Sequence, residues 1–68
     1  MKIGKKDILG IKAGTSIMFH MDDYESINSA KTYAYQLSKS REKPIDVEKY
    51  RTSVNKDKLE LTIEAVRK

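Results

Sequence analysis

One long amphipathic segment, covering residues 22–40, constrains the possible folds of this chain more than any other feature. Apolar residues within it recur at spacings of three, four and three, which places them on one stripe of an α-helix. These residues are Ile27, Ala30, Ala34 and Leu37. No other segment has a helical pattern of this length. One helix is therefore expected to form one wall of the core, and strands the other.

The two ends of this segment carry helix-terminating signals. Asp22 followed by Glu25 has the spacing of a capping box, and their carboxylates suit the positive pole of the helix dipole. Pro44 prevents the helix from continuing. A helix from about Asp22 or Asp23 to about Ser40 is predicted.

Short apolar stretches before the helix predict a β-hairpin. Residues 1–7 are polar and lysine-rich, and we expect them to form a frayed lead-in. Residues 8–11 are mostly apolar, residues 12–15 include Gly14 and resemble a turn, and residues 16–21 alternate between apolar and other side chains. Two strands joined by a four-residue turn follow from this pattern.

The last twenty residues predict a second hairpin. Residues 41–48 form a charged connector, in which Ile45 and Val47 are expected to contact the body of the domain. Apolar and polar side chains then alternate on both sides of a turn at residues 55–58. We expect Val54 to face Leu59 on the inner side of this hairpin, and the same register sets Lys49 opposite Glu64 on the outer side.

Together these elements predict a single α+β domain over residues 1–68. The order is β-β-α-β-β, with the helix on one face of a small antiparallel or mixed sheet. A core this small gives limited stability, and the absence of cysteine excludes disulfides, so association as a homodimer is one way to gain stability. No apolar run is long enough to cross a membrane and no leader segment is recognisable, so a cytoplasmic protein without a membrane partner is expected.

The sequence lacks the residues that catalysis or metal binding would need. His20 is the single histidine, and with Asp22 and Asp23 beside it the usual reading is a strand residue next to a helix cap. No nucleophile motif, phosphate-binding loop or cofactor motif is present. A non-enzymatic protein without cofactor or metal is predicted.

The charge distribution favours a polyanion as partner. The net charge is +4, and residues 1–21 and 49–68 each carry +3 whereas residues 22–48 carry −2. Known helix-turn-helix, KH and RRM modules need elements that this chain lacks. We therefore expect a nucleic-acid-binding regulatory or accessory protein, with DNA favoured over RNA, that uses a basic sheet surface and hairpin turns. Its expected phosphate contacts are Lys12, Lys49, Arg51, Lys56 and Lys58.

The alternative is a protein-interaction module or small inhibitor. The outward face of the helix is rich in Ser, Asn and Thr, which lower helix propensity and are able to form specific hydrogen bonds. Such a module would bind its partner through this face or through a sheet edge. The expected contacts on the helix are Asn28, Thr32, Tyr33 and Gln36.

Overall fold

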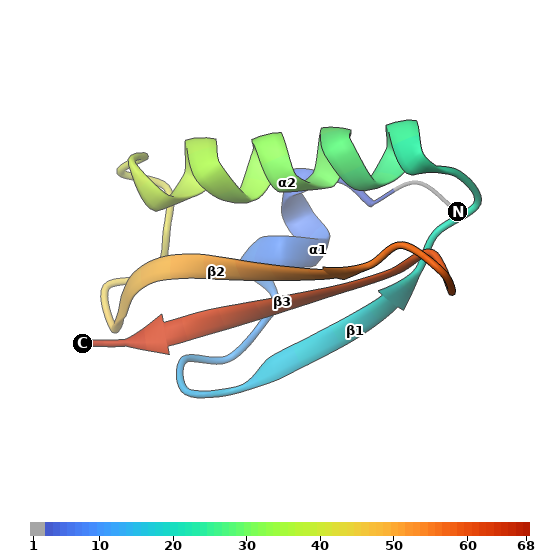
Figure 1. Ribbon diagram of the computed structural model, residues 1–68. Coiled ribbons are helices and arrows are strands. Elements are labelled where there is room, and N and C mark those ends of the chain that lie inside the picture. The colour runs from blue at the N-terminus through green and yellow to red at the C-terminus, as the bar shows by residue number, and fades with distance from the viewer. Residues whose placement is uncertain (1–2) are drawn as a thin grey trace.

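The computed structural model describes residues 3–68, which form a small α+β fold with a three-stranded antiparallel sheet (Figure 1). The sheet order is β1-β3-β2, so the last strand is the central one. Both helices lie on the same side of the sheet (Figure 1). In chain order the elements are α1 (Lys5–Leu9), β1 (Ser16–His20), α2 (Tyr24–Ser38), β2 (Val47–Asn55) and β3 (Glu60–Arg67).

Helix α2 is the helix predicted between residues 22 and 40, with slightly tighter bounds. Its apolar stripe is confirmed, since Ile27, Ala30, Ala34 and Leu37 are all buried. The capping residue is Asp23 rather than Asp22, because the Asp23 side chain accepts a hydrogen bond from the Ser26 amide at 2.7 Å. A carboxylate acceptor at this position satisfies one of the unpaired amides of the first turn.

The predicted first strand is wrong, because residues 5–9 form helix α1. The Asp7 carboxylate accepts a hydrogen bond from the Gly4 amide at 2.8 Å, which supports the start of this helix. Ile8 and Ile11 are then both buried in the core. The remaining elements keep the predicted order β-α-β-β, and residues 3–68 contain two helices instead of the one predicted.

The expected turn before β1 is present. The Thr15 amide donates to the Lys12 carbonyl at 3.0 Å, and Gly14 adopts a φ of +83°, a conformation that favours glycine. The predicted lead-in ends earlier than expected, because Ile3 is already buried in the core. Residues 1–2 of that lead-in lie outside the described residues.

The C-terminal hairpin is confirmed, with a register that differs by two residues from the predicted one. Val54 faces Leu61 instead of Leu59, and Arg51 rather than Lys49 faces Glu64. A shift of two residues keeps every side chain on its predicted face. The cause is a turn displaced by one residue: strand β2 extends to Asn55, which faces Glu60, so the four turn residues are 56–59 instead of 55–58. Leu59 belongs to this turn, with a positive φ of 52°.

Hydrogen bonds stabilise the connector between α2 and β2. The Tyr50 amide donates to Ser38 Oγ at 2.9 Å, and Lys43 Nζ donates to the carbonyl oxygens of Ser38, at 3.1 Å, and Glu48. Val47 is buried as predicted. Ile45 is 90% exposed, so its predicted contact with the body of the domain is wrong.

Candidate nucleic-acid interface

The outer face of the sheet, opposite the helices, is polar but electrically balanced. Cross-strand rows on this face join Ser16, Glu64 and Arg51, and then Met18, Thr62 and Ser53. Lys49 and Arg51 supply two positive charges there, whereas Glu60 and Glu64 supply two negative ones. Arg51 faces Glu64 directly, which is an attractive pairing across the two strands. The sheet face alone is therefore not a basic surface.

Positive charge gathers instead at one end of the molecule. At this end α2 finishes, β2 begins and β3 finishes beside the turn that precedes β1 (Figure 1). We call it the basic end. Among residues 3–68, seven basic and three acidic side chains lie there, which gives a balance of +4. They are Lys12, Lys39, Arg41, Lys43, Lys49, Arg67 and Lys68, with Glu42, Asp46 and Glu48.

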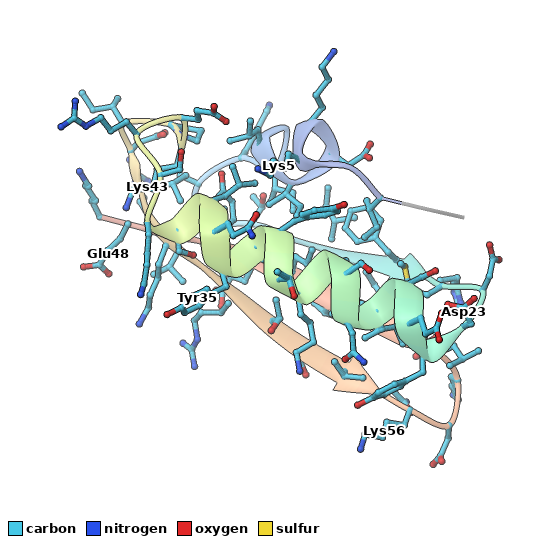
Figure 2. All side chains as sticks on the ribbon, turned by 90° about the horizontal axis from the view of Figure 1, so that it is seen from above. Lys5, Asp23, Tyr35, Lys43, Glu48 and Lys56 are labelled. Carbon is cyan, nitrogen blue, oxygen red and sulfur yellow. The ribbon has the colours of Figure 1, made fainter. Side chains whose placement is uncertain are left out.

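The opposite end is acidic. It holds the start of α2 and the turn between β2 and β3, and we call it the acidic end. Of the residues that the structure describes, two bases and five acids lie there and give a balance of −3. They are Lys56 and Lys58, with Asp22, Asp23, Glu25, Asp57 and Glu60. Figure 2 shows the polarity along α2, with Lys43 and Glu48 near one end of the helix and Asp23 and Lys56 near the other.

The five lysines and arginines expected to contact phosphate do not form one surface. Lys12 and Lys49 belong to the basic end, and Arg51 follows Lys49 on the outer face of β2. Lys56 and Lys58 are in the turn of the acidic end, where the Lys56 ammonium lies 5.4 Å from the centre of the Tyr24 ring. The molecule extends 33 Å along its longest axis, so the two groups are well separated.

The basic end contains residues that sequence reasoning did not select. Arg41 is an exposed residue of the connector, and Arg67 is an exposed residue at the end of β3. They lie far apart in the sequence and share one end of the molecule because β3 runs antiparallel to β2, whose first residue Val47 faces Arg67. Predicting this cluster from the sequence would require knowing the strand register, and the sequence alone does not determine it.

Two lysines of the basic end are partly engaged within the fold. The Lys43 ammonium is bound to two backbone carbonyls, one of them at the end of α2, where a cation also suits the helix dipole. Lys39 donates to the Tyr35 hydroxyl and lies 4.5 Å from the centre of its ring. The exposed residues best placed to reach an external anion are therefore Lys12, Arg41, Lys49 and Arg67.

The residues expected to contact a protein lie on two different parts of α2. Asn28, Thr32 and Gln36 are exposed at intervals of four and form one outward stripe. The Thr32 hydroxyl donates a hydrogen bond to the Asn28 backbone carbonyl at 3.0 Å, so its proton is already bonded within the helix. Tyr33 is half-buried, packs against the core and lines a shallow groove with Ile3 and Ser29.

His20 pairs across the sheet rather than with its neighbouring acids. Its Nε2 atom lies 3.7 Å from Glu60 Oε2, on the outer face where the two residues are opposite each other. Within residues 3–68, no group of three or more His, Cys, Asp or Glu side chains is arranged to hold a metal ion.

Comparisons of the chain with protein-family models, with curated proteins and with solved structures found no match. Among residues 3–68, no helix is long and apolar enough to cross a membrane.

Proposed function

We propose that this chain is a small, non-enzymatic nucleic-acid-binding protein, of a regulatory or accessory kind, that holds the phosphate backbone of DNA with its basic end. The single observation that carries the proposal is the excess of four positive charges at that end, against an excess of three negative charges at the opposite end of the described residues. A local excess of Lys and Arg attracts a polyanion and gains free energy from the release of its counterions.

The basic end is suited to backbone contacts rather than to reading base edges. Its exposed bases come from a turn, a connector and the terminal parts of two strands. Lys and Arg on such segments contact phosphates, which position a protein on the duplex without specifying sequence. We therefore expect weak sequence preference and strong salt dependence.

A matched pair of double variants tests the proposal. Lys12→Ala with Lys49→Ala removes two charges from the basic end, and Lys56→Ala with Lys58→Ala removes the same number from the acidic end. Fluorescence anisotropy with a labelled duplex, starting at ~50 mM salt, measures the affinity and its salt dependence. Each phosphate contact that is lost lowers the slope of log affinity against log salt by about 0.9 on B-DNA.

The basic-end pair should weaken binding and lower the slope by up to about 2, whereas the acidic-end pair should leave the slope nearly unchanged. Equal effects of the two pairs would show that the location of the charge is irrelevant. An absence of binding at low salt would refute the proposal and favour the protein-interaction module, with Asn28, Thr32 and Gln36 as its contact stripe. Parallel titrations with single-stranded DNA and RNA establish which nucleic acid is preferred.

A further inference from the structure

Strand β1 leaves one edge of the sheet without a partner strand among residues 3–68. On its other side, the Met21 amide donates to the Leu59 carbonyl at 2.8 Å and Thr15 accepts from the Ala65 amide at 3.0 Å. These odd-numbered residues direct their backbone groups toward β3. Because successive residues of an antiparallel strand direct these groups to alternate sides, the amides and carbonyls of Ser16, Met18 and His20 point to the open edge.

The opposite edge of the sheet, on β2, is protected in several ways. Ser38 Oγ accepts a hydrogen bond from the Tyr50 amide, and Lys43 donates to the Glu48 carbonyl. The strand also has an irregularity between Val47 and Lys49. Folded proteins use such features, with charged side chains, to prevent pairing with further strands.

Strand β1 has none of these protections. Its five residues include no charged Lys, Arg, Asp or Glu and no proline. Ile17 is 42% exposed and Met18 is 48% exposed, although both are apolar. An open edge with exposed apolar side chains is a template for a further strand.

We propose that β1 pairs in antiparallel fashion with β1 of a second copy of this chain, about a two-fold axis at Met18, to join the two sheets into one. In this register Met18 faces the partner's Met18, and Ser16 faces the partner's His20. All of these residues direct their backbone groups to the open edge. The pairing would therefore form about six backbone hydrogen bonds between the two copies.

The side chains of β1 are complementary to themselves in this register. On the inner face Ile17 faces the partner's Phe19 in a pair without backbone hydrogen bonds, where side chains approach most closely. Aromatic and β-branched residues form favourable cross-strand pairs. The two-fold axis repeats this pair, so both exposed Ile17 side chains would become covered.

The charge distribution supports a second copy of the same chain as the occupant. Lys12 lies just before β1, whereas Asp22 and Asp23 lie just after it. An antiparallel pair therefore places the basic end of each copy beside the acidic end of the other. A parallel pair would bring like charges together, and opposite potentials favour both association and register.

Sedimentation equilibrium on the full chain and two variants tests this pairing. Pairing of two five-residue strands is expected to bury less than the ~800 Å² per partner of a standard complex. We therefore expect a dissociation constant on the order of 10–100 µM. Met18→Lys places two ammonium groups opposite each other. Met18→Pro removes the Met18 amide of each copy, which donates a hydrogen bond only in the dimer. Each should raise the dissociation constant at least tenfold.

Ser53→Lys is the matched control. Ser53 lies in the same cross-strand row as Met18, on the other edge strand, so it adds the same charge away from the proposed interface. It should leave the dissociation constant unchanged. A wild-type chain that remains monomeric at ~1 mM, well above the constant expected for this interface, would overturn the proposal. Equal dissociation constants for the wild type and both Met18 variants would also overturn it.

The absence of cysteine from the chain permits a second, covalent test. Residues that face each other as a hydrogen-bonded pair have Cα atoms ~5.5 Å apart, within the range that a disulfide spans. Mild oxidation should convert Met18→Cys to a disulfide-linked dimer on a non-reducing gel, and Ser53→Cys should remain mostly monomeric. The reverse result would place the contact between copies elsewhere and refute the β1 pairing.

Discussion

Removing the hydroxyl group of Tyr50 should stabilise the protein. Tyr50 lies on the inner face of β2, is only 6% exposed, and its hydroxyl oxygen is buried without a hydrogen-bond partner among residues 3–68. Burial of an unpaired hydroxyl costs about 1–3 kcal/mol in mutational data. Tyr50→Phe removes this penalty and leaves a gap of one oxygen atom, so we expect a net gain of about 1 kcal/mol.

The effect should depend on pH in a defined direction. Burial raises the pKa of the Tyr50 hydroxyl above its usual value of 10.0, and the negative charge of Asp46 raises it further. Between the unfolded pKa and the higher folded pKa, the folded state keeps a proton that the unfolded state releases. The free energy of unfolding therefore falls as pH rises through this window. Phe has no titrating hydroxyl, so the free energy of unfolding of the variant does not fall in this way.

Urea denaturation and thermal melts, both followed by circular dichroism, measure the gain in stability and its dependence on pH. At pH 7 the gain of about 1 kcal/mol corresponds to a rise in Tm of roughly 4–8 °C for a domain of this size. The difference between variant and wild type should stay constant up to about pH 9 and widen above about pH 10. Tyr24→Phe is the control, since Tyr24 is 42% exposed and its substitution should change stability by less than about 0.5 kcal/mol. A destabilised Tyr50→Phe variant, or a difference that stays constant to high pH, would refute the reasoning.

Three further predictions concern helix α2 and the turn of the C-terminal hairpin. Leu37→Asp should prevent folding, because it buries an unpaired charge, whereas the adjacent Gln36→Glu should stay folded by circular dichroism. Asp23→Ala should lower the free energy of unfolding by about 1 kcal/mol, and Asp23→Asn should restore most of it, because Asn also accepts the capping hydrogen bond. Leu59→Val should destabilise more than Leu59→Asn in thermal melts, because a β-branched side chain fits poorly at a φ of 52° whereas Asn tolerates it.

The parts of the fold that periodicity determines could be predicted from the sequence. The stripe of Ile27, Ala30, Ala34 and Leu37 has one interpretation, because no strand buries residues at this spacing. Residues 8–11 have two interpretations, since Ile8 and Ile11 also suit one side of a helical turn. The hydrogen bond from the Gly4 amide to the Asp7 carboxylate favours the helix. Helix α1 has only five residues, too few for a helical repeat to be recognised in the sequence.

The hairpin register illustrates a different limit. Pairing Val54 with Leu59 or with Leu61 places the same side chains inside, so alternation alone does not distinguish the two registers. The difference lies in Leu59, which adopts a left-handed conformation that is unusual for a leucine and so belongs to the turn instead of the strand.

The candidate site depends on this register and on the path of the connector. Charge counted by segment gives residues 49–68 a balance of +3, but it groups Lys56 and Lys58 with Arg67. In the fold, the turn that carries the two lysines lies beside the acidic start of α2, and Arg67 lies at the opposite end. Proximity in sequence was therefore a poor guide to the electrostatic surface.

The most direct test of the basic-end proposal is a titration of the ¹⁵N-labelled protein with a short duplex, followed by amide chemical shifts. The proposal predicts that the largest shifts fall on residues 12–15, 39–49 and 66–68, and that they disappear as salt is added. Amides 56–58 at the acidic end should move little. Largest shifts at residues 56–58, or an absence of shifts at low salt, would contradict it.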